Sequence, residues 1–396
     1  MQMLRRNTQT MIDQWTQLSA EIADARYDQD AKGQIVVIGS GLSFVDFTRD
    51  AEEELLSADA VFHCVYDKVT QTWIGQIRPD AYDLRILYGE SIDRHLTYVR
   101  MAEAMLHFVR LGKKVVAVLY GHPGVFAMPA HRAVHIARSE GHQAKMRPGI
   151  SALDYLVADI GFDPALPGLA TFEATDMLLR KRRIDPTLHV VLWQVGVVGE
   201  FQFSPGGFEN RGFEMLVARL EETYGPDWEV THYIAPQYVG IDPLIDRIPV
   251  SRLLDETTRK AISSLSTFYI EPKVEVDTDY VISLQLGFIR EGQEAPAPMR
   301  LYDYTRYAAR ERFAVRGFAR FTPPPHYRLA SYSPEYEFML GLSRDIKLQA
   351  QYKIDPTRVV AASSLPLHSE RSAKLLAIPH PRAIDAALNE ASVAEG

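Results

Sequence analysis

The stretch KVVAVLYGHPGVF, residues 114–126, decides how this chain folds. Its first residues are almost all apolar and predict a buried strand, which runs straight into a turn containing Gly121 and Gly124. Glycines at such a turn leave the backbone uncovered, so we expect something to approach it closely. A histidine, His122, stands between them.

Strands and helices alternate on both sides of this stretch. Apolar runs at 34–39, 60–65 and 114–120 predict strands, and 91–112 predicts a long helix with Ser91 as N-cap and Gly112 just past its end. Further strands are predicted within 189–196, 228–236 and 263–272. Such alternation predicts an α/β fold of two subdomains, with helices on both faces of a parallel or mixed sheet.

The α/β domain is predicted to span 34–272, with subdomains of about 34–146 and 147–272, and the remaining segments differ from it in composition. Residues 1–33 predict an amphipathic helix that packs on its own body or on a second subunit. Residues 273–333, rich in tyrosine, arginine and proline, predict an irregular arm. A small all-α bundle is predicted for 334–388 and a polar tail for 389–396.

Composition excludes several classes of function. The 396 residues carry a formal net charge of −8, which argues against nucleic acid or an anionic membrane as partner. No apolar run is long enough to span a membrane, and no signal sequence is recognised, so a cytoplasmic location is expected. The single cysteine, Cys64, is expected to be a buried apolar residue, and the histidines lack the spacing of metal ligands.

Four small-residue turns follow strands: 39–41, 121–126, 148–152 and 194–199. Because ligands bind at strand ends in open α/β sheets, these turns predict one nucleotide-sized pocket lined mainly by backbone. A dinucleotide is disfavoured, since Phe44 occupies the position of the third glycine in the G-x-G-x-x-G motif.

The long helix carries the polar groups of interest. Arg94 and Tyr98 lie four residues apart on one helix face, and Tyr88 stands just before the helix. They form either an ordinary surface pair or a site in which Arg94 stabilises a phenolate that acts as base. Spacing alone does not choose between these readings.

The motifs VVIGSGL, YGHPGVF, AHRAVHIARSEG, RPGISALDYLVADIGFDP, TFEATDM, VLWQVGVVG, HYIAP and STFYIEP occur in the order found in borosin α-N-methyltransferases. The chain therefore resembles this peptide-methylating branch of the tetrapyrrole methylase superfamily over about residues 34–272. Tetrapyrrole methylases typically have aspartate where this chain has His122, which favours the peptide-modifying branch. Residues 334–388 resemble the borosin binding domain, and the arm resembles the clasp that interlocks a homodimer.

The resemblance implies S-adenosylmethionine as cofactor and no metal. It implies catalytic roles for Tyr88, Arg94, Tyr98 and Tyr120. The implied cofactor contacts are Gly121, His122, Val125, Phe126, Ser151, Ala152, Gln194 and Gly196.

An amide nitrogen is a poor nucleophile because its lone pair is delocalised into the carbonyl. Methylation therefore needs the N–H proton removed or the imidate stabilised while the methyl is held in line. In this reading Tyr88 is the base, Arg94 its activator and Tyr98 the stabiliser of the carbonyl or imidate.

One feature departs from the family. Fused borosin proteins end in an apolar core peptide, whereas AIDAALNEASVAEG follows the bundle here. The substrate is then this atypical tail or a separate precursor peptide, or the bundle has a regulatory or structural role. The alternatives for the whole protein are a small-molecule methyltransferase of tetrapyrrole type and a peptide-binding protein with lost catalysis.

Overall fold

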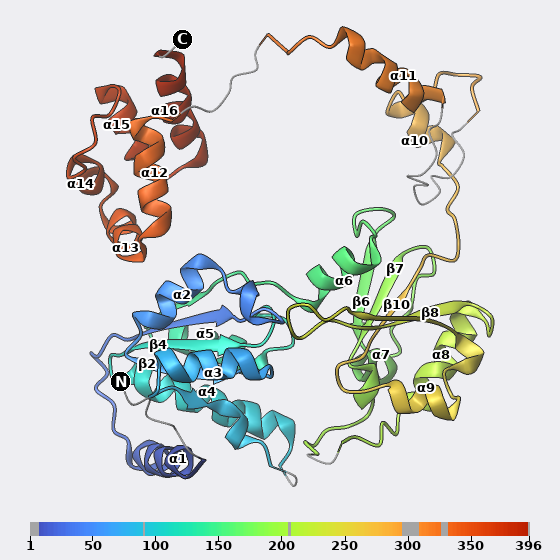
Figure 1. Ribbon diagram of the computed structural model, residues 1–396, viewed down its shortest axis with the longest axis horizontal. Coiled ribbons are helices and arrows are strands. Elements are labelled where there is room, and N and C mark those ends of the chain that lie inside the picture. The colour runs from blue at the N-terminus through green and yellow to red at the C-terminus, as the bar shows by residue number, and fades with distance from the viewer. Residues whose placement is uncertain (1–7, 90–91, 205–206, 295–308, 326–331, 395–396) are drawn as a thin grey trace. The chain divides into compact units, whose positions relative to one another are not determined.

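The computed structural model describes residues 8–89, 92–204, 207–294, 309–325 and 332–394 (Figure 1). The chain divides into two compact units. Residues up to 303 form the larger unit, apart from 52–54, which group with residues 304–396 in the smaller one. Both predicted subdomains lie in the larger unit, so the site between them belongs to one compact body.

The first half of the larger unit is built on a parallel sheet. Within the described residues its strand order is β3-β2-β4-β1-β5, and every pairing is parallel. Its strands are β1 Gln34–Gly39, β2 Ala60–Cys64, β3 Tyr82–Asp83, β4 Lys114–Leu119 and β5 Gln143–Met146.

Helices cover both faces of this sheet, as the alternation predicts (Figure 1). Alternate residues such as Ile35 and Val36 point to opposite faces and are fully buried in two separate cores. The helices of this half are α1 Thr8–Asp24, α2 Arg49–Leu56, α3 Lys68–Ile77, α4 Arg94–Arg110 and α5 Met128–Ser139. Helices α1, α4 and α5 pack in one core, and α2 and α3 in the other.

The second half is built on a mixed sheet of order β6-β7-β10-β8-β9 among the described residues, in which only β6 and β7 run parallel. Helices α7 and α8 contribute to the core on one face, and α6 covers the other. The elements are α6 Ala152–Ile160, β6 Leu169–Glu173, α7 Ala174–Leu179, β7 His189–Trp193, α8 Phe213–Tyr224, β8 Glu229–Ile234, β9 Leu244–Pro249, α9 Glu256–Ala261 and β10 Thr267–Ile270.

Strands β6 and β9 are absent from the sequence prediction. Both are only partly buried or exposed, and β9 carries Asp246 and Arg247 in its middle. They lie at the two edges of the sheet and lack the apolar runs that mark the central strands.

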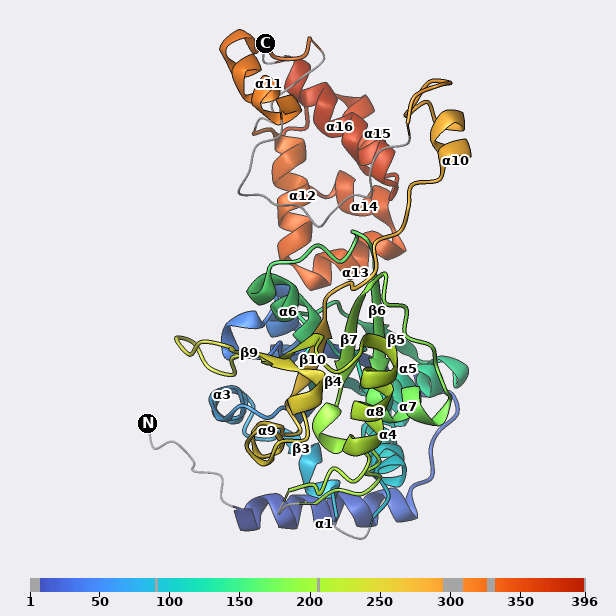
Figure 2. The same ribbon diagram turned by 90° about the vertical axis from the view of Figure 1, so that its right-hand side faces the viewer.

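Helix α1 packs on the larger unit of its own chain (Figure 2). This is the first of the two surfaces, its own body or a second subunit, that we expect for the N-terminal helix. Trp15 is 5% exposed and lies edge-on to the rings of Phe62 and Tyr82, at centroid distances of 6.5 and 5.6 Å. Leu18, nearly one turn later, is 1% exposed. Burial of these two side chains fixes α1 beside β3 and α4.

The predicted arm is not uniformly irregular. It contains α10 Tyr280–Gln285 in the larger unit and α11 Ala309–Gly317 in the smaller one, so the division between the units falls inside the range 273–333. Neither helix shows a sustained apolar stripe, which explains why periodicity did not reveal them.

The C-terminal bundle is helical, as predicted. Its helices are α12 Pro334–Arg344, α13 Ile346–Ile354, α14 Pro356–Ala361, α15 Glu370–Leu376 and α16 Pro381–Ala394. Phe338, Leu342, Tyr352 and Leu376 lie in its core. Helix α16 continues to Ala394, so the predicted polar tail is helical over most of its length. The predicted N-cap Ser91 lies outside the described residues, and Asp93 caps α4 instead.

Candidate active site

A cavity of about 530 Å³ lies in the larger unit, where the two halves meet. Residues from three of the four predicted turns line it: Gly121, His122, Val125 and Phe126 from the second, Ser151 and Ala152 from the third, and Gln194 and Val197 from the fourth. The first turn, 39–41, contributes no lining residue, although Leu42 directly after it lines the cavity. Three of the four strand-end turns therefore converge on one pocket.

The turn after β4 is shaped by backbone contacts between glycines. Gly121 has a φ of +70°, and its N–H donates to the carbonyl of Gly41 at 2.9 Å. A Cβ placed on Gly39 would stand 2.2 Å from the carbonyl oxygen of Gly121. A Cβ on Gly121 would meet nothing within 4 Å, so this backbone faces open space where a ligand fits.

His122 has a structural role in this turn that the sequence left unassigned. Its Nδ1 accepts a hydrogen bond from the backbone N–H of Gly124 at 3.0 Å, and its carbonyl accepts from the N–H of Val125. An aspartate at this position would offer a carboxylate acceptor for the same kind of turn. His122 therefore closes the turn through its ring nitrogen.

Two residues of the pocket hold an unfavourable backbone. Phe126 has a φ of +53° and Gln194 a φ of +58°, a region that side chains disfavour. The ring of Phe126 lies 6.0 Å from that of Trp193, the residue before Gln194. Strained positions of this kind cluster at ligand sites, where the surrounding structure holds them in place.

Helix α6 begins at the pocket. Ser151 is its N-cap and accepts from the N–H groups of Leu153 and Asp154, while the Asp154 carboxylate accepts from the Ser151 backbone at 2.6 Å. This capping box fixes the first turn of the helix, so Ser151 and Ala152 line the cavity in a defined conformation.

Three of the four predicted catalytic residues, Tyr88, Arg94 and Tyr98, come together at the same cavity, and Tyr120 lines it as well. Tyr88 ends a short 3₁₀ turn at Leu84–Leu87, and Arg94 and Tyr98 lie on the first turns of α4. The rings of Tyr88 and Tyr98 are perpendicular, with centroids 6.3 Å apart. Tyr88 also packs on Phe203 at 4.9 Å.

Arg94 joins the two halves of the larger unit. Its Nη2 donates to the carbonyl oxygen of Glu200 at 2.7 Å, and its backbone N–H donates to that of Phe201. The guanidinium lies 5.4 Å from the ring centroid of Phe208. The guanidinium charge is therefore held at the cavity wall by contacts made far away in sequence.

Burial dominates the acidity of the phenols. It raises the pKa of Tyr88 far above its usual value, with further rises from Cys64, Tyr98 and Tyr66, and it raises the pKa of Tyr120 to about 12. The largest influences on the pKa of Tyr88 besides burial come from other acidic groups and not from Arg94. The activation of Tyr88 by Arg94 that the resemblance implies stays a prediction.

The structure gathers the predicted site residues around one cavity, with one exception. Gly196 does not line it, because the backbone of Gly196 packs against Ser263, whose oxygen would lie 1.9 Å from an added Cβ. The need for glycine there is explained by chain packing.

Sequence reasoning missed the aromatic lining. These residues are Tyr66, Trp193, Phe203, Phe208 and Tyr233. Tyr66 lies two residues after the end of β2, so the strand-end rule applied to that strand would have found it. Phe203 and Phe208 lie in a long connection without periodic pattern, and only tertiary structure brings them to the site.

None of the described helices has the length and apolarity needed to cross a membrane. No group of three or more histidine, cysteine or acidic side chains in the described ranges is placed to hold a metal ion.

Comparison with known proteins identifies similar chains. The family model for tetrapyrrole (corrin/porphyrin) methylases matches residues 34–201. A protein of Dendrothele bispora, described as a methyltransferase and ribosomally synthesized cyclic peptide dendrothelin A precursor, is 39% identical over 339 residues, or 83% of this chain and 81% of that protein. The corresponding omphalotin A precursor of Omphalotus olearius is 37% identical, with the same coverage of both chains.

A protein of Anomoporia bombycina, described as a methyltransferase and ribosomally synthesized type III borosin cyclic peptide precursor, is 40% identical over 84% of this chain. This chain spans only 40% of the length of that relative. Among solved structures, uroporphyrin-III-C-methyltransferase from Thermus thermophilus aligns with 65% of this chain and 97% of its own, at 17% identity and a TM-score of 0.42.

Proposed function

Because this chain belongs to the family of borosin methyltransferases, we propose that it transfers methyl groups from S-adenosylmethionine to backbone amide nitrogens of a precursor peptide. The observation that carries the proposal is the single cavity that unites the glycine turn at 121–126 with Tyr88, Arg94 and Tyr98. One wall suits a nucleoside-like donor and the other a polar acceptor.

The residues on the first wall fit the proposed donor. The open backbone at Gly121, the N-terminus of α6 and the strained Phe126 and Gln194 form a cradle with few side chains in the way. When bound there, S-adenosylmethionine supplies an electrophilic methyl group on a positively charged sulfur. A cation beside the phenols would also lower the pKa that burial raises.

Tyr88, Arg94 and Tyr98 form the part of the cavity that acts on the substrate amide. In this proposal Tyr88 accepts the proton of the amide nitrogen and Tyr98 donates a hydrogen bond to the carbonyl oxygen. Both side chains line the cavity, which supports these roles. Arg94, anchored on Glu200, supplies a fixed positive charge toward the negative charge that develops on that oxygen. These roles remain our proposal.

The peptide comes either from the chain's own C-terminal segment or from a separate precursor. Residues as far as Ala394 belong to α16, where backbone N–H groups are engaged in helical hydrogen bonds. Methylation of this segment would require it to unfold first, whereas a separate extended peptide presents its amides directly. We therefore propose that the substrate is an extended peptide, whether it belongs to this chain or to a separate precursor.

We further propose a homodimer held by the arm. Leu286 and Phe288 after α10, and Phe313, Phe318 and Phe321 around α11, are each 67% to 78% exposed. Large apolar side chains at this exposure mark interaction surfaces. Light scattering should give twice the mass of the chain, and the double variant Phe313→Ser with Phe318→Ser should give the monomer mass.

Mass spectrometry tests the activity. The purified chain is incubated with S-adenosylmethionine and a peptide library, and fragment spectra locate each added methyl on a backbone nitrogen. Tyr88→Phe and Arg94→Ala should abolish the increments, while Tyr224→Phe, which removes a buried hydroxyl outside the cavity, should not. Absence of donor binding by the folded wild type, or methylation of a tetrapyrrole instead of peptide, would overturn the proposal.

A further inference from the structure

Tyr66 is a phenol of the cavity that the proposed mechanism does not use. It lies two residues beyond β2 and lines the same cavity as Tyr88, Tyr98 and Tyr120. Its ring meets that of Tyr120 edge-on, with centroids 5.8 Å apart. Nearly half of the side chain, 48%, remains accessible, so Tyr66 contacts both the site and water.

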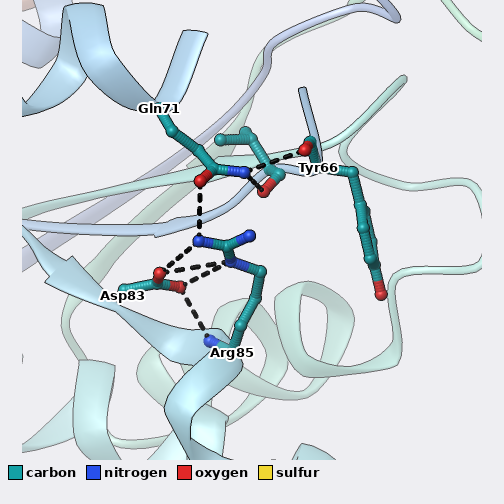
Figure 3. A network of polar contacts seen from close by, with 5 residues as sticks. Tyr66, Gln71, Asp83 and Arg85 are labelled. Atoms are coloured by element: carbon teal, nitrogen blue, oxygen red, sulfur yellow. Dashed lines mark hydrogen bonds and ion pairs between the residues drawn. The ribbon is translucent and has the colours of Figure 1, made fainter. Parts of the chain in front are cut away.

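A polar network fixes the backbone at Tyr66 (Figure 3). The Nε2 group of Gln71 donates to the carbonyl oxygens of Val65 and Tyr66, at 3.0 and 2.8 Å. The Oε1 atom of Gln71 accepts from Nη2 of Arg85 at 2.9 Å, and Arg85 pairs with Asp83. Arginine can only donate, so this contact determines which end of the Gln71 amide faces the two carbonyls.

The phenol ring of Tyr66 extends away from Gln71, while the network holds the backbone from the other side (Figure 3). Ion pairing between Asp83 and Arg85 prevents the arginine from leaving Gln71, and the amide cannot rotate without losing both carbonyl contacts. The backbone from which the Tyr66 side chain extends is thereby held by groups outside the cavity.

The charges around Tyr66 and Tyr88 differ. Burial raises the pKa of Tyr66 to about 12, and the influence of Arg85 and of the Tyr88 hydroxyl acts against that rise. The pKa of Tyr88 is raised further, because Tyr88 is buried and the acidic groups of Cys64, Tyr98 and Tyr66 add to the rise. Of the two phenols, Tyr66 therefore releases its proton at the lower pH.

We propose that Tyr66 completes a proton relay in which Tyr88 passes the proton of the substrate amide to Tyr66, which returns it to water. This inference rests on the proposed function. As the bond from nitrogen to methyl forms and the bond from methyl to sulfur breaks, the amide proton moves to the Tyr88 oxygen. The hydroxyl proton of Tyr88 moves to the phenolate of Tyr66, so that one proton leaves the amide and one arrives on Tyr66.

The exposure of the two residues supports this direction. Tyr88 is partly buried and packs on Phe203 and Tyr98, so a proton left on it has no direct exit to solvent. Tyr66 is the more exposed phenol and exchanges its proton with water between turnovers. Asp83, Arg85 and Gln71 do not line the cavity, and we propose that they act as positioning residues through the backbone of Tyr66.

Tyr66→Phe tests the relay, because it keeps the ring contact with Tyr120 and removes the hydroxyl. Single-turnover methylation should slow about 100-fold, within the range of general acid–base catalysis, and its dependence on pH should move to higher pH. Tyr224→Phe is the matched control and should keep the wild-type rate and pH profile. Gln71→Leu should slow the reaction while leaving donor affinity unchanged.

Replacement of Tyr66 by 3-fluorotyrosine, which is more acidic and nearly isosteric, provides a second variant. It should shift the pH profile to lower pH. Donor binding and circular dichroism establish that each variant is folded. An unchanged rate and pH profile in folded Tyr66→Phe, or no shift with 3-fluorotyrosine, would refute the relay.

A readout without turnover separates this inference from the proposed function. The readout is the NMR spectrum of protein labelled at the tyrosine ring carbon that bears the oxygen. Tyr66→Phe should displace the resonance of Tyr88 in this spectrum, whereas Tyr224→Phe should not. A displaced resonance in a protein that methylates no peptide would refute the function but retain the coupled phenols. If Tyr66→Phe leaves the Tyr88 resonance unmoved and the wild type methylates peptide, the two phenols are not coupled and the relay is refuted.

Discussion

The guanidinium of Arg94 donates to the backbone carbonyl of Glu200 at 2.7 Å, a contact across 106 positions of sequence. It connects the first turn of α4, in the half with the parallel sheet, to the loop that follows β7 in the other half. One side chain therefore places charge in the cavity and holds its two walls together, so the site is complete only when both halves are folded.

Replacement of Arg94 separates these two contributions. Arg94→Lys keeps a positive charge but loses the planar group that bonds Glu200 and stacks on Phe208, so we expect methyl transfer to fall by about 10²-fold. Arg94→Ala should fall further. Peptide methylation rates measure the effect, with Arg252→Ala, an exposed arginine elsewhere, as control. Wild-type activity in Arg94→Lys would show that methyl transfer does not need the planar guanidinium group.

The buried phenols predict how stability depends on pH. Burial raises the pKa of Tyr120 to about 12, against about 10 in the unfolded chain. The unfolded state therefore loses its proton first, so the free energy of unfolding should be constant below about pH 10 and decrease as pH rises toward 12.

Denaturant unfolding measured from pH 7 to 11 checks this dependence. Tyr120→Phe should weaken the decrease above pH 10, because phenylalanine cannot ionise. An identical decrease in Tyr120→Phe and wild type would assign the effect to other groups.

The turn closed by His122 predicts a difference between two substitutions. His122→Ala removes the acceptor for the N–H of Gly124 and should weaken binding of S-adenosylmethionine about fivefold, since a hydrogen bond contributes about 1 kcal/mol. His122→Asp restores an acceptor and should bind more tightly than His122→Ala. Calorimetric titration measures both, with His135→Ala on the exposed surface of α5 as control. Equal affinities for alanine and aspartate would show that the turn does not need this acceptor.

Backbone strain at Gln194 predicts opposite effects on stability and binding. Gln194→Gly removes the unfavourable positive φ and should change the free energy of unfolding by at most about 1 kcal/mol, in the stabilising direction. The β-branched Gln194→Val should destabilise by about 2 kcal/mol. Both should bind the donor less tightly because they lack the glutamine side chain at the cavity. Thermal unfolding and donor titration give the two readouts, and a stabilised Gln194→Val would contradict the backbone assignment.

Much of the fold could be predicted from local pattern. Central strands such as β4 and β7 are apolar throughout because both of their faces are covered by helices, and Gly112 ends α4 with a φ of +78°. Edge strand β9 escaped prediction because an exposed strand needs no apolar run. The end of α16 is helical although its sequence, NEASVA, shows no sustained apolar stripe.

For the site, the sequence by itself determined the glycine turns and the spacing of Tyr88, Arg94 and Tyr98, since positive φ angles and helix periodicity are local properties. Only the tertiary structure decided which groups meet across the cavity. Glu200 as the partner of Arg94, Tyr66 beside Tyr88, and Gly196 packed on Ser263 all depend on contacts between distant segments. Such contacts depend on the packing of the two halves, and no local pattern of residues encodes them.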